Sequence, residues 1–277
     1  MSHNSAAPVS GSRSPSLRQR HPGSRRRRAR GWVPDQHGAW AMLTVPLLVG
    51  VVVGGPAWVH VPLAVAWYVA YFAFFAAGLW LRSGRKARYF PPVRVYALVA
   101  VVPGLVVCVV RPEVLWWALV FGPLVVGSAV CSHYRADRSL LNDVLTVVAA
   151  TLMLPVAWSL GSTPGHEVAM WQSTAMVGAY FVGTVLYVKT MIRERGSRMY
   201  YVASVVYHLM LVVVPFVWAQ SERGLVHEGG AAIFAAFFTL LAARAVIMPQ
   251  VGGTPRQVGM GEIGASLVLV VLLLGAW

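Results

Sequence analysis

The stretch from Arg25 to Gly50 reads RRRRARGWVPDQHGAWAMLTVPLLVG and passes within a few residues from a block of arginines to an apolar run. An aspartate, a glutamine and a histidine stand between its two tryptophans, Trp32 and Trp40. Tryptophan is enriched at the membrane–water interface, and basic residues are retained on the cytoplasmic side of a membrane. The stretch therefore indicates the start of a first membrane span, with the amino terminus in the cytoplasm.

The composition of the chain is that of a protein embedded in a membrane. Of its 277 residues, 57% are hydrophobic and 12% are charged, whereas a soluble domain carries about 25% charged residues. Apolar runs long enough to cross a bilayer recur along nearly the whole chain, and they lack the alternating pattern of an outer-membrane barrel. We therefore predict an all-α fold, a polytopic transmembrane helical bundle.

Stretches of about 20 apolar residues between polar breaks locate the membrane spans. They predict nine spans, at residues 38–56, 58–81, 94–110, 114–131, 142–160, 169–191, 200–219, 229–248 and 257–277. Only Arg111, Pro112 and Glu113 separate the third span from the fourth, so we expect these two spans to form a tight hairpin.

The basic residues set the expected orientation. With the amino terminus in the cytoplasm, 21 of the 23 lysine and arginine residues fall on the cytoplasmic side, and only Arg111 and Arg223 fall outside. Such an asymmetry is what the positive-inside rule requires. We expect residues 1–31 to form a disordered, basic cytoplasmic tail, residues 32–277 to form the transmembrane domain, and Trp277 to end outside.

The topology also explains the net charge of +14. Basic residues at the membrane surface attract anionic lipid headgroups, each contributing about 1 kcal/mol. Because no folded soluble domain accompanies the arginine block, the sequence does not indicate nucleic-acid binding. The two cysteines, Cys108 and Cys131, lie in or beside apolar runs, which favours neither a disulfide framework nor a cysteine metal site.

Three polar residues at the start of the first span, Asp35, Gln36 and His37, admit two interpretations. Asp35 can favour the amino terminus of a helix, with His37 wetted at the membrane surface. Alternatively, the three side chains line a cavity that opens to the cytoplasm. Gly38 and Ala39 are small and would allow a neighbouring helix to approach closely there.

Further polar residues gather at the cytoplasmic ends of the other spans. They are Arg82, Arg135, Asn142, Asp143, Lys189, Arg193, Arg244 and Glu262. In one bundle they would surround a pocket with an excess of positive charge, which suits a phosphate, a carboxylate or an anionic lipid headgroup. The alternative is that the lysine and arginine side chains reach individually to the lipid headgroups.

His208 lies deeper, about eight residues or roughly 12 Å into the seventh span. An ionisable group at this depth is costly to bury and is a functional candidate. Tyr201, Tyr207 or a backbone carbonyl can satisfy a neutral histidine there, whereas a ligand or proton role is the alternative. No second histidine lies at metal-ligand spacing on the same helix, so we predict no metal.

The segments PDQHGAWAMLTVPLLVG, RADRSLLNDVL and VKTMIRERGS resemble the opening segment and the polar segments of the YwiC-like family, bacterial multi-pass membrane proteins without an established biochemical activity. The resemblance covers nearly all of the chain after the tail, and QHGAW is its most specific part. It implies a location in the bacterial cytoplasmic membrane and gives no cofactor.

The nine spans, with polar cytoplasmic loops after spans two, four and six, are also distantly similar to the UbiA-type prenyltransferases. Those enzymes carry aspartate-rich motifs in the loops after spans two and six, where magnesium ions hold a prenyl diphosphate. Here the corresponding loops read RSGRKARYFPPVR and KTMIRERGSRMYY and contain no aspartate. The similarity therefore does not extend to magnesium-dependent prenyl transfer of the usual kind.

Three classes of function remain open. The first, which we favour, is an enzyme or lipid-binding protein that acts on an isoprenoid or phospholipid at the cytoplasmic leaflet. In this class Arg82, Lys189 and Arg193 would hold a phosphate, and His37 or Asp143 would be the acid–base group.

The second class is a proton-coupled transporter of small solutes that uses His208 and Glu262. It requires a second polar gate on the outer side, where the sequence shows few polar groups. The third class is a non-catalytic factor that assembles other membrane proteins and needs no pocket.

Overall fold

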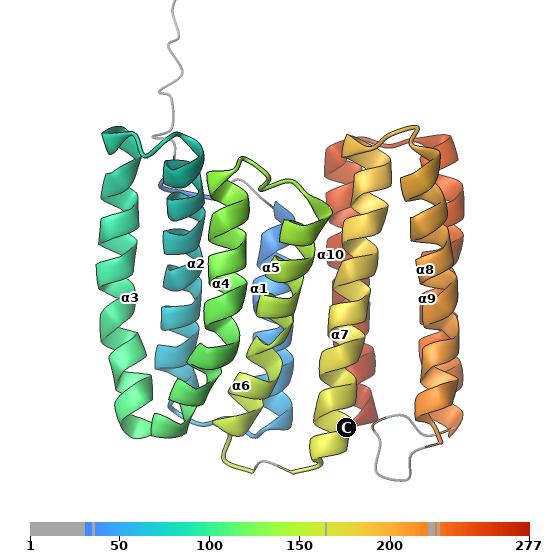
Figure 1. The fold of residues 1–277 in the computed structure, drawn as a ribbon. Coiled ribbons are helices and arrows are strands. Elements are labelled where there is room, and N and C mark those ends of the chain that lie inside the picture. Colours follow the sequence, from blue (N-terminus) through green and yellow to red (C-terminus); the bar gives the residue numbers. More distant parts are fainter. Residues whose placement is uncertain (1–30, 35–36, 164, 221–224, 226–227) are drawn as a thin grey trace, which may run out of the picture. The chain divides into compact units, whose positions relative to one another are not determined.

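The computed structural model describes residues 31–34, 37–163, 165–220, 225 and 228–277, and every regular element in this part of the chain is helical (Figure 1). The α-helices are α1 (His37–Val53), α2 (His60–Arg82), α3 (Phe90–Val110), α4 (Trp117–His133), α5 (Leu140–Thr151), α6 (Met153–Ser159), α7 (Glu167–Val188), α8 (Arg198–Trp218), α9 (Glu228–Val251) and α10 (Pro255–Ala276). The short 3-10 segments η1 (Ala87–Tyr89) and η2 (Pro112–Trp116) precede α3 and α4, and a π-helical turn, η3 (Lys189–Arg193), continues α7. The all-α fold that the sequence predicts is confirmed.

Eight of the described helices are long and apolar enough to cross a membrane, and a shorter apolar helix, Gly38–Val53, belongs to α1. α5 and α6 count as one crossing that is broken at Leu152. The break has a local cause, because Pro155 has no N–H to donate to the carbonyl of Thr151. These helices match the predicted spans in number, and the chain is a multi-pass membrane protein.

The first span ends earlier than the sequence predicts. The expected span was 38–56, whereas α1 ends at Val53. Gly55, with φ +83°, turns the chain there in a conformation that favours glycine. The apolar residues that follow α1 therefore belong to the connection to α2 rather than to the helix.

The expected hairpin between the third and fourth spans is present, because Arg111 alone separates α3 from η2. Its Nε atom lies 2.8 Å from Oε1 of Glu113, and its Nη2 donates to the carbonyl of Ser159, 3.2 Å away. Arg111 thereby fixes the hairpin to the end of α6.

The connections alternate between two ends of the bundle (Figure 1). The loops after α2, α4, η3 and α9 lie at the end where α1 begins, which we call the basic end. The loops after α1, α3 and α6 and the carboxyl terminus lie at the far end. The basic end is the side predicted to be cytoplasmic, and this orientation stays a prediction. The tail predicted to be disordered lies, up to residue 30, outside the described residues.

Helix α1 packs against α2, α5, α6, α7 and α10. Its face toward α6 carries Gly50 and Gly54, one turn apart. A Cβ atom at Gly50 would lie 2.3 Å from the carbonyl oxygen of Leu154, and one at Gly54 would lie 2.6 Å from the carbonyl oxygen of Trp158. The two backbones are therefore in direct contact, as in other small-xxx-small contacts between membrane helices.

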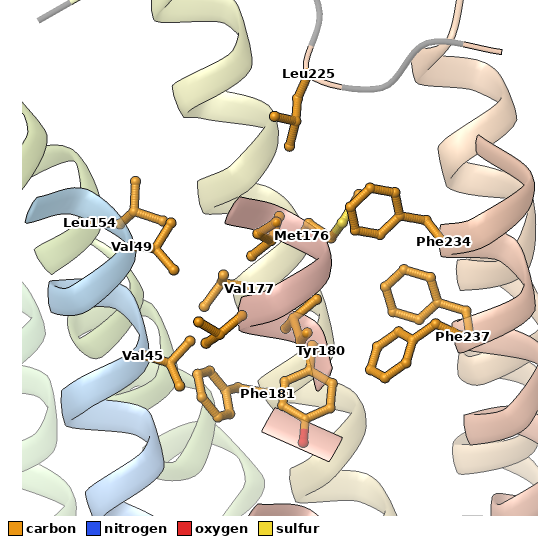
Figure 2. Packing of buried hydrophobic residues seen from close by; sticks show 14 of the residues in the cluster. Val45, Val49, Leu154, Met176, Val177, Tyr180, Phe181, Leu225, Phe234 and Phe237 are labelled. Atoms are coloured by element: carbon orange, nitrogen blue, oxygen red, sulfur yellow. The ribbon is translucent and has the colours of Figure 1, made fainter. Parts of the chain in front are cut away.

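Helix α7 lies in the core between α1 on one side and α9 on the other. Figure 2 shows Val45 of α1 near Phe181 of α7, and Tyr180 of α7 near Phe237 of α9, within one buried cluster. The ring centroids of Tyr180 and Phe237 are 6.2 Å apart. In the most apolar window of the α7 span 56% of the residues are buried, against 6% in the α3 span. α7 is therefore surrounded by protein, whereas α3 presents its apolar side chains to the lipid.

Gly50→Ala should destabilise the bundle, because the added methyl group would overlap a backbone oxygen that cannot move independently of α6. We expect a loss of about 2 kcal/mol or more in the free energy of unfolding, measured by denaturant titration of the purified protein in detergent. Gly122→Ala in α4 is the matched control, since no atom lies within 4 Å of its added methyl group. Equal stability of the two variants would contradict the backbone contact.

Candidate functional site

The first buried ion pair joins α5 to the π-helical turn after α7. The side chain of Lys189 is 4% exposed, and its Nζ lies 2.8 Å from Oδ2 of Asp143. Nζ also donates to the backbone carbonyl of Arg138, 2.8 Å away. Asp143 stands in the first turn of α5, whose amino terminus is capped by Ser139. The cap fixes the start of α5 and so places Asp143 opposite η3.

The loop between α4 and α5 connects this pair to α2. Nδ2 of Asn142 donates to the carbonyl of Asp137 at 2.9 Å, and its Oδ1 accepts a hydrogen bond from the Ser128 hydroxyl at 2.6 Å. The guanidinium of Arg82 forms an ion pair with the carboxylate of Asp137. Arg82 and Asn142 thus hold the loop in place. Arg135, in the same loop, is exposed and adopts φ +59°.

The second buried ion pair joins α9 to α10, with α7 supplying its other partners. Nη1 of Arg244 lies 2.5 Å from Oε1 of Glu262, and the Glu262 side chain is only 7% exposed. The hydroxyl of Thr184 donates to Oε2 of Glu262 at 2.8 Å, and the hydroxyl of Tyr180 donates to the Glu262 carbonyl at 3.1 Å. The guanidinium carbon of Arg244 lies 4.1 Å from the centroid of the Tyr187 ring. Glu262 is therefore held on both carboxylate oxygens.

His208 is 1% exposed and faces α7 from α8. Its Nδ1 lies 2.7 Å from the carbonyl oxygen of Ser204, which can only accept, so Nδ1 carries a proton. A Cβ atom at Gly183 would lie 3.1 Å from Nε2, so glycine at that position leaves room for the ring. The hydroxyl of Tyr207 donates instead to the carbonyl of Ala179. The hydrogen-bond partner of His208 is therefore the carbonyl of its own helix.

The structure does not describe the polar side chains that were predicted to line a site at the start of the first span. Asp35 and Gln36 lie outside the described residues, and of His37 only the backbone at the start of α1 is described. Just before them, the carbonyl of Trp32 accepts a hydrogen bond of 2.6 Å from the hydroxyl of Tyr96 on α3. The chain therefore passes α3 before it enters the bundle.

The structure brings some of the predicted site residues together and separates others. α7 and η3 gather Asp143, Lys189, His208, Arg244 and Glu262 around one helix, in two ion pairs and a separate histidine. Arg193 follows in η3 but is exposed and forms no ion pair among the described residues. The same part of the chain contains no group of three or more histidine, cysteine or acidic residues placed to hold a metal ion.

A cleft that the sequence did not single out lies at the basic end, between α2 and α3. Its volume is about 420 Å³, and its lining consists of Trp80, Arg85, Ala87, Phe90, Pro91, Arg94 and Val95. The lining contains no acidic residue, and within the described chain neither arginine forms an ion pair. The Trp80 and Phe90 rings are 5.3 Å apart, and the guanidinium of Arg85 lies 5.9 Å from the Trp80 ring. We call this site the elbow cleft.

A sequence signal for the elbow cleft exists in LWLRSGRKARYFPPVR, residues 79–94, where basic residues stand between and beside aromatic ones. The basic residues of this segment indicated the orientation of the chain, and Arg82 was the one expected to bind a phosphate. Arg82, however, is paired with Asp137, whereas Arg85 and Arg94 are not paired. The folded structure is needed to show which of these arginines have no carboxylate partner and can bind an anion.

His60 is a further buried polar residue, and it was not among the predicted site residues. Its Nδ1 accepts a hydrogen bond from the backbone N–H of Ala57, and its Nε2 lies 2.8 Å from the carbonyl of Ala157. A ring that accepts at Nδ1 and donates at Nε2 is neutral. His60 therefore fastens the start of α2 to α6 and has no nitrogen left for a ligand.

Fold and site together define a polytopic α-helical membrane protein with ion pairs buried inside its bundle. The sequence model of the YwiC-like protein family matches residues 33–158. The chain is 31% identical over 194 residues to the "Uncharacterized protein YwiC" of Bacillus subtilis. This alignment covers 69% of this chain and 79% of that protein. It is 27% identical over 245 residues to an "Uncharacterized protein" of Haemophilus influenzae, covering 88% of this chain and 98% of that protein. The chain belongs to the YwiC-like family.

No solved structure matches this chain. The distant similarity to UbiA-type prenyltransferases therefore gains no support from the comparisons. The family match ends within α6 and so includes the elbow cleft and Asp143 but neither Arg244 nor Glu262.

Removing one partner of the first ion pair should cost more than removing both. Asp143→Ala leaves the buried ammonium of Lys189 without its carboxylate, and we expect a loss of about 3 kcal/mol in the free energy of unfolding. The double variant Asp143→Ala, Lys189→Met should regain most of that loss, because no unpaired charge remains.

The measurement is denaturant unfolding of the purified variants, with Arg193→Ala as the control for an exposed charge in the same turn. Arg193→Ala should change the free energy of unfolding by less than about 0.5 kcal/mol. If the double variant is as unstable as Asp143→Ala, the unpaired ammonium of Lys189 is not the cause of the lost stability.

Proposed function

We propose that the protein binds a phosphate-bearing amphiphile at the inner leaflet of the bacterial cytoplasmic membrane, through the elbow cleft. The ligand class is an anionic lipid headgroup or an isoprenoid phosphate. The observation that carries the proposal is one cleft in which two unpaired arginines, Arg85 and Arg94, stand beside Trp80 and Phe90.

The chemistry of the lining suits such a ligand. A guanidinium group binds phosphate oxygens with two parallel N–H donors, and such charge-assisted hydrogen bonds are stronger than neutral ones. Tryptophan and phenylalanine beside it can contact the apolar chain, and tryptophan is enriched at headgroup depth. A volume of about 420 Å³ lies within the roughly 300–1,000 Å³ typical of small-molecule sites.

The ion pairs of the bundle favour the elbow cleft over a phosphate site at Arg82 and Lys189, which the sequence predicted. Lys189 is neutralised by Asp143, Arg244 by Glu262 and Arg82 by Asp137. A buried ion pair loses much of its attraction for an outside anion, because its field is that of a dipole. We therefore assign the phosphate-holding role to Arg85 and Arg94.

The basic tail supports a site for anions at the same end. Arg25–Arg28 stand a few residues before Gly31 in the sequence. A Cβ atom at Gly31 would lie 3.5 Å from Pro92 and 3.7 Å from Leu79, on the two helices that form the elbow. Gly31 therefore lies against the elbow, and basic residues near a membrane surface attract anionic headgroups.

Arg85→Gln, Arg94→Gln should weaken binding of the ligand at least tenfold, since each lost charge-assisted hydrogen bond contributes roughly 1.5 kcal/mol or more. The measurement is native mass spectrometry of the purified protein titrated with phosphatidylglycerol and, separately, with farnesyl monophosphate. Tighter binding of one of the two identifies the source of the phosphate.

The matched control is Arg135→Gln, Arg193→Gln, which removes the same charge from exposed, unpaired positions at the basic end outside the cleft. It should retain wild-type binding apart from a small general electrostatic loss. Equal weakening in the two double variants would contradict a specific site and leave only surface charge attraction.

A further inference from the structure

Arg244 has hydrogen-bonding capacity that its ion pair does not use. Nη1 faces Glu262, but Nε and Nη2 are buried and have no hydrogen-bond partner among the described residues. Inside hydrocarbon, each donor left without an acceptor is costly, and more so when the group is charged. The arrangement therefore calls for an acceptor on that side of the guanidinium.

Nε and Nη2 form the side edge of a guanidinium, where two N–H bonds point in parallel. This edge binds both oxygens of a carboxylate, or two oxygens of a phosphate, at once. We propose that the Nε–Nη2 edge of Arg244 is a second anion site, which takes one carboxylate or phosphate group of a small solute while Nη1 stays with Glu262.

The surrounding groups restrict the charge of such a ligand. The charged or titratable groups near the edge are Glu262 from α10, His208 from α8, and Tyr180 and Tyr187 from α7. Lys189, the next cation on this side of the bundle, is occupied by Asp143. An anion on Arg244 therefore competes with Glu262 for a single positive charge. Neutralising Glu262 should strengthen anion binding rather than weaken it.

The site lies about two helical turns inside the basic end of the bundle. Arg244 stands seven residues before the end of α9 and Glu262 seven residues after the start of α10, which corresponds to about 10 Å. One turn nearer the basic end lies a small apolar cluster that includes Tyr187, Met191 and Val258. A solute that enters from this end has to displace that cluster, because Nε and Nη2 of Arg244 are themselves buried.

The test compares anion-dependent unfolding temperatures of the purified protein in acetate, in phosphate and in sodium chloride of equal ionic strength. Acetate or phosphate should raise the unfolding temperature of the wild type by about 3 °C at roughly ten times its dissociation constant. Glu262→Gln should show the same rise at lower anion concentration. Arg244→Lys, which keeps the charge but loses the side edge, should show no rise in acetate beyond that in chloride.

Each comparison is made against the variant's own unfolding temperature in chloride, so a general loss of stability does not enter. A purely structural ion pair predicts no anion-specific rise in the wild type, or the same rise in all three proteins, and either result would overturn the proposal. The Arg85→Gln, Arg94→Gln protein separates this site from the elbow cleft, because its response to acetate, which offers the cleft no phosphate group, should be unchanged. Loss of the response in that protein would likewise refute the Arg244 site.

Discussion

A charge inside a bilayer has to find its partner within the protein, and this constraint organises the bundle around α7. The carboxylates of Asp143 and Glu262 and the cations Lys189 and Arg244 form two ion pairs that contact α7 or its π-helical extension. Between them, the pairs tie α5, α9 and α10 to the most buried span. Breaking either pair would leave a single charge in a medium that stabilises it poorly.

The same constraint separates the buried interior from the surface at the basic end. On the other side of α7, α1 and α6 contact each other through their backbones at Gly50 and Gly54, where no polar side chain fits. Arg85 and Arg94, which form no ion pair among the described residues, stand at its edge in and after the turn between α2 and α3. The elbow cleft thus combines two cations that lack a carboxylate partner with the aromatic side chains of Trp80 and Phe90.

The sequence predicted most of the fold, because about 20 consecutive apolar residues between polar ones locate a membrane span without any knowledge of tertiary contacts. It misplaced the end of the first span, since a positive φ at Gly55 is not visible in hydropathy. The sequence also singled out acids and bases that the structure buries, but it did not show which of them would meet. The pairing of Arg244 with Glu262 depends on how α9 and α10 pack against α7, and the availability of Arg85 rather than Arg82 depends on where Asp137 lies.

The central claim, that the elbow cleft holds a phosphate group at the membrane surface, is tested most directly by an electron cryo-microscopy structure of the protein in nanodiscs that contain phosphatidylglycerol. The account predicts headgroup density within hydrogen-bonding distance of the guanidinium groups of both Arg85 and Arg94, with an acyl chain beside Trp80 and Phe90. A cleft filled only by acyl chains, or one in which the two arginines turn away to the solvent, would contradict it.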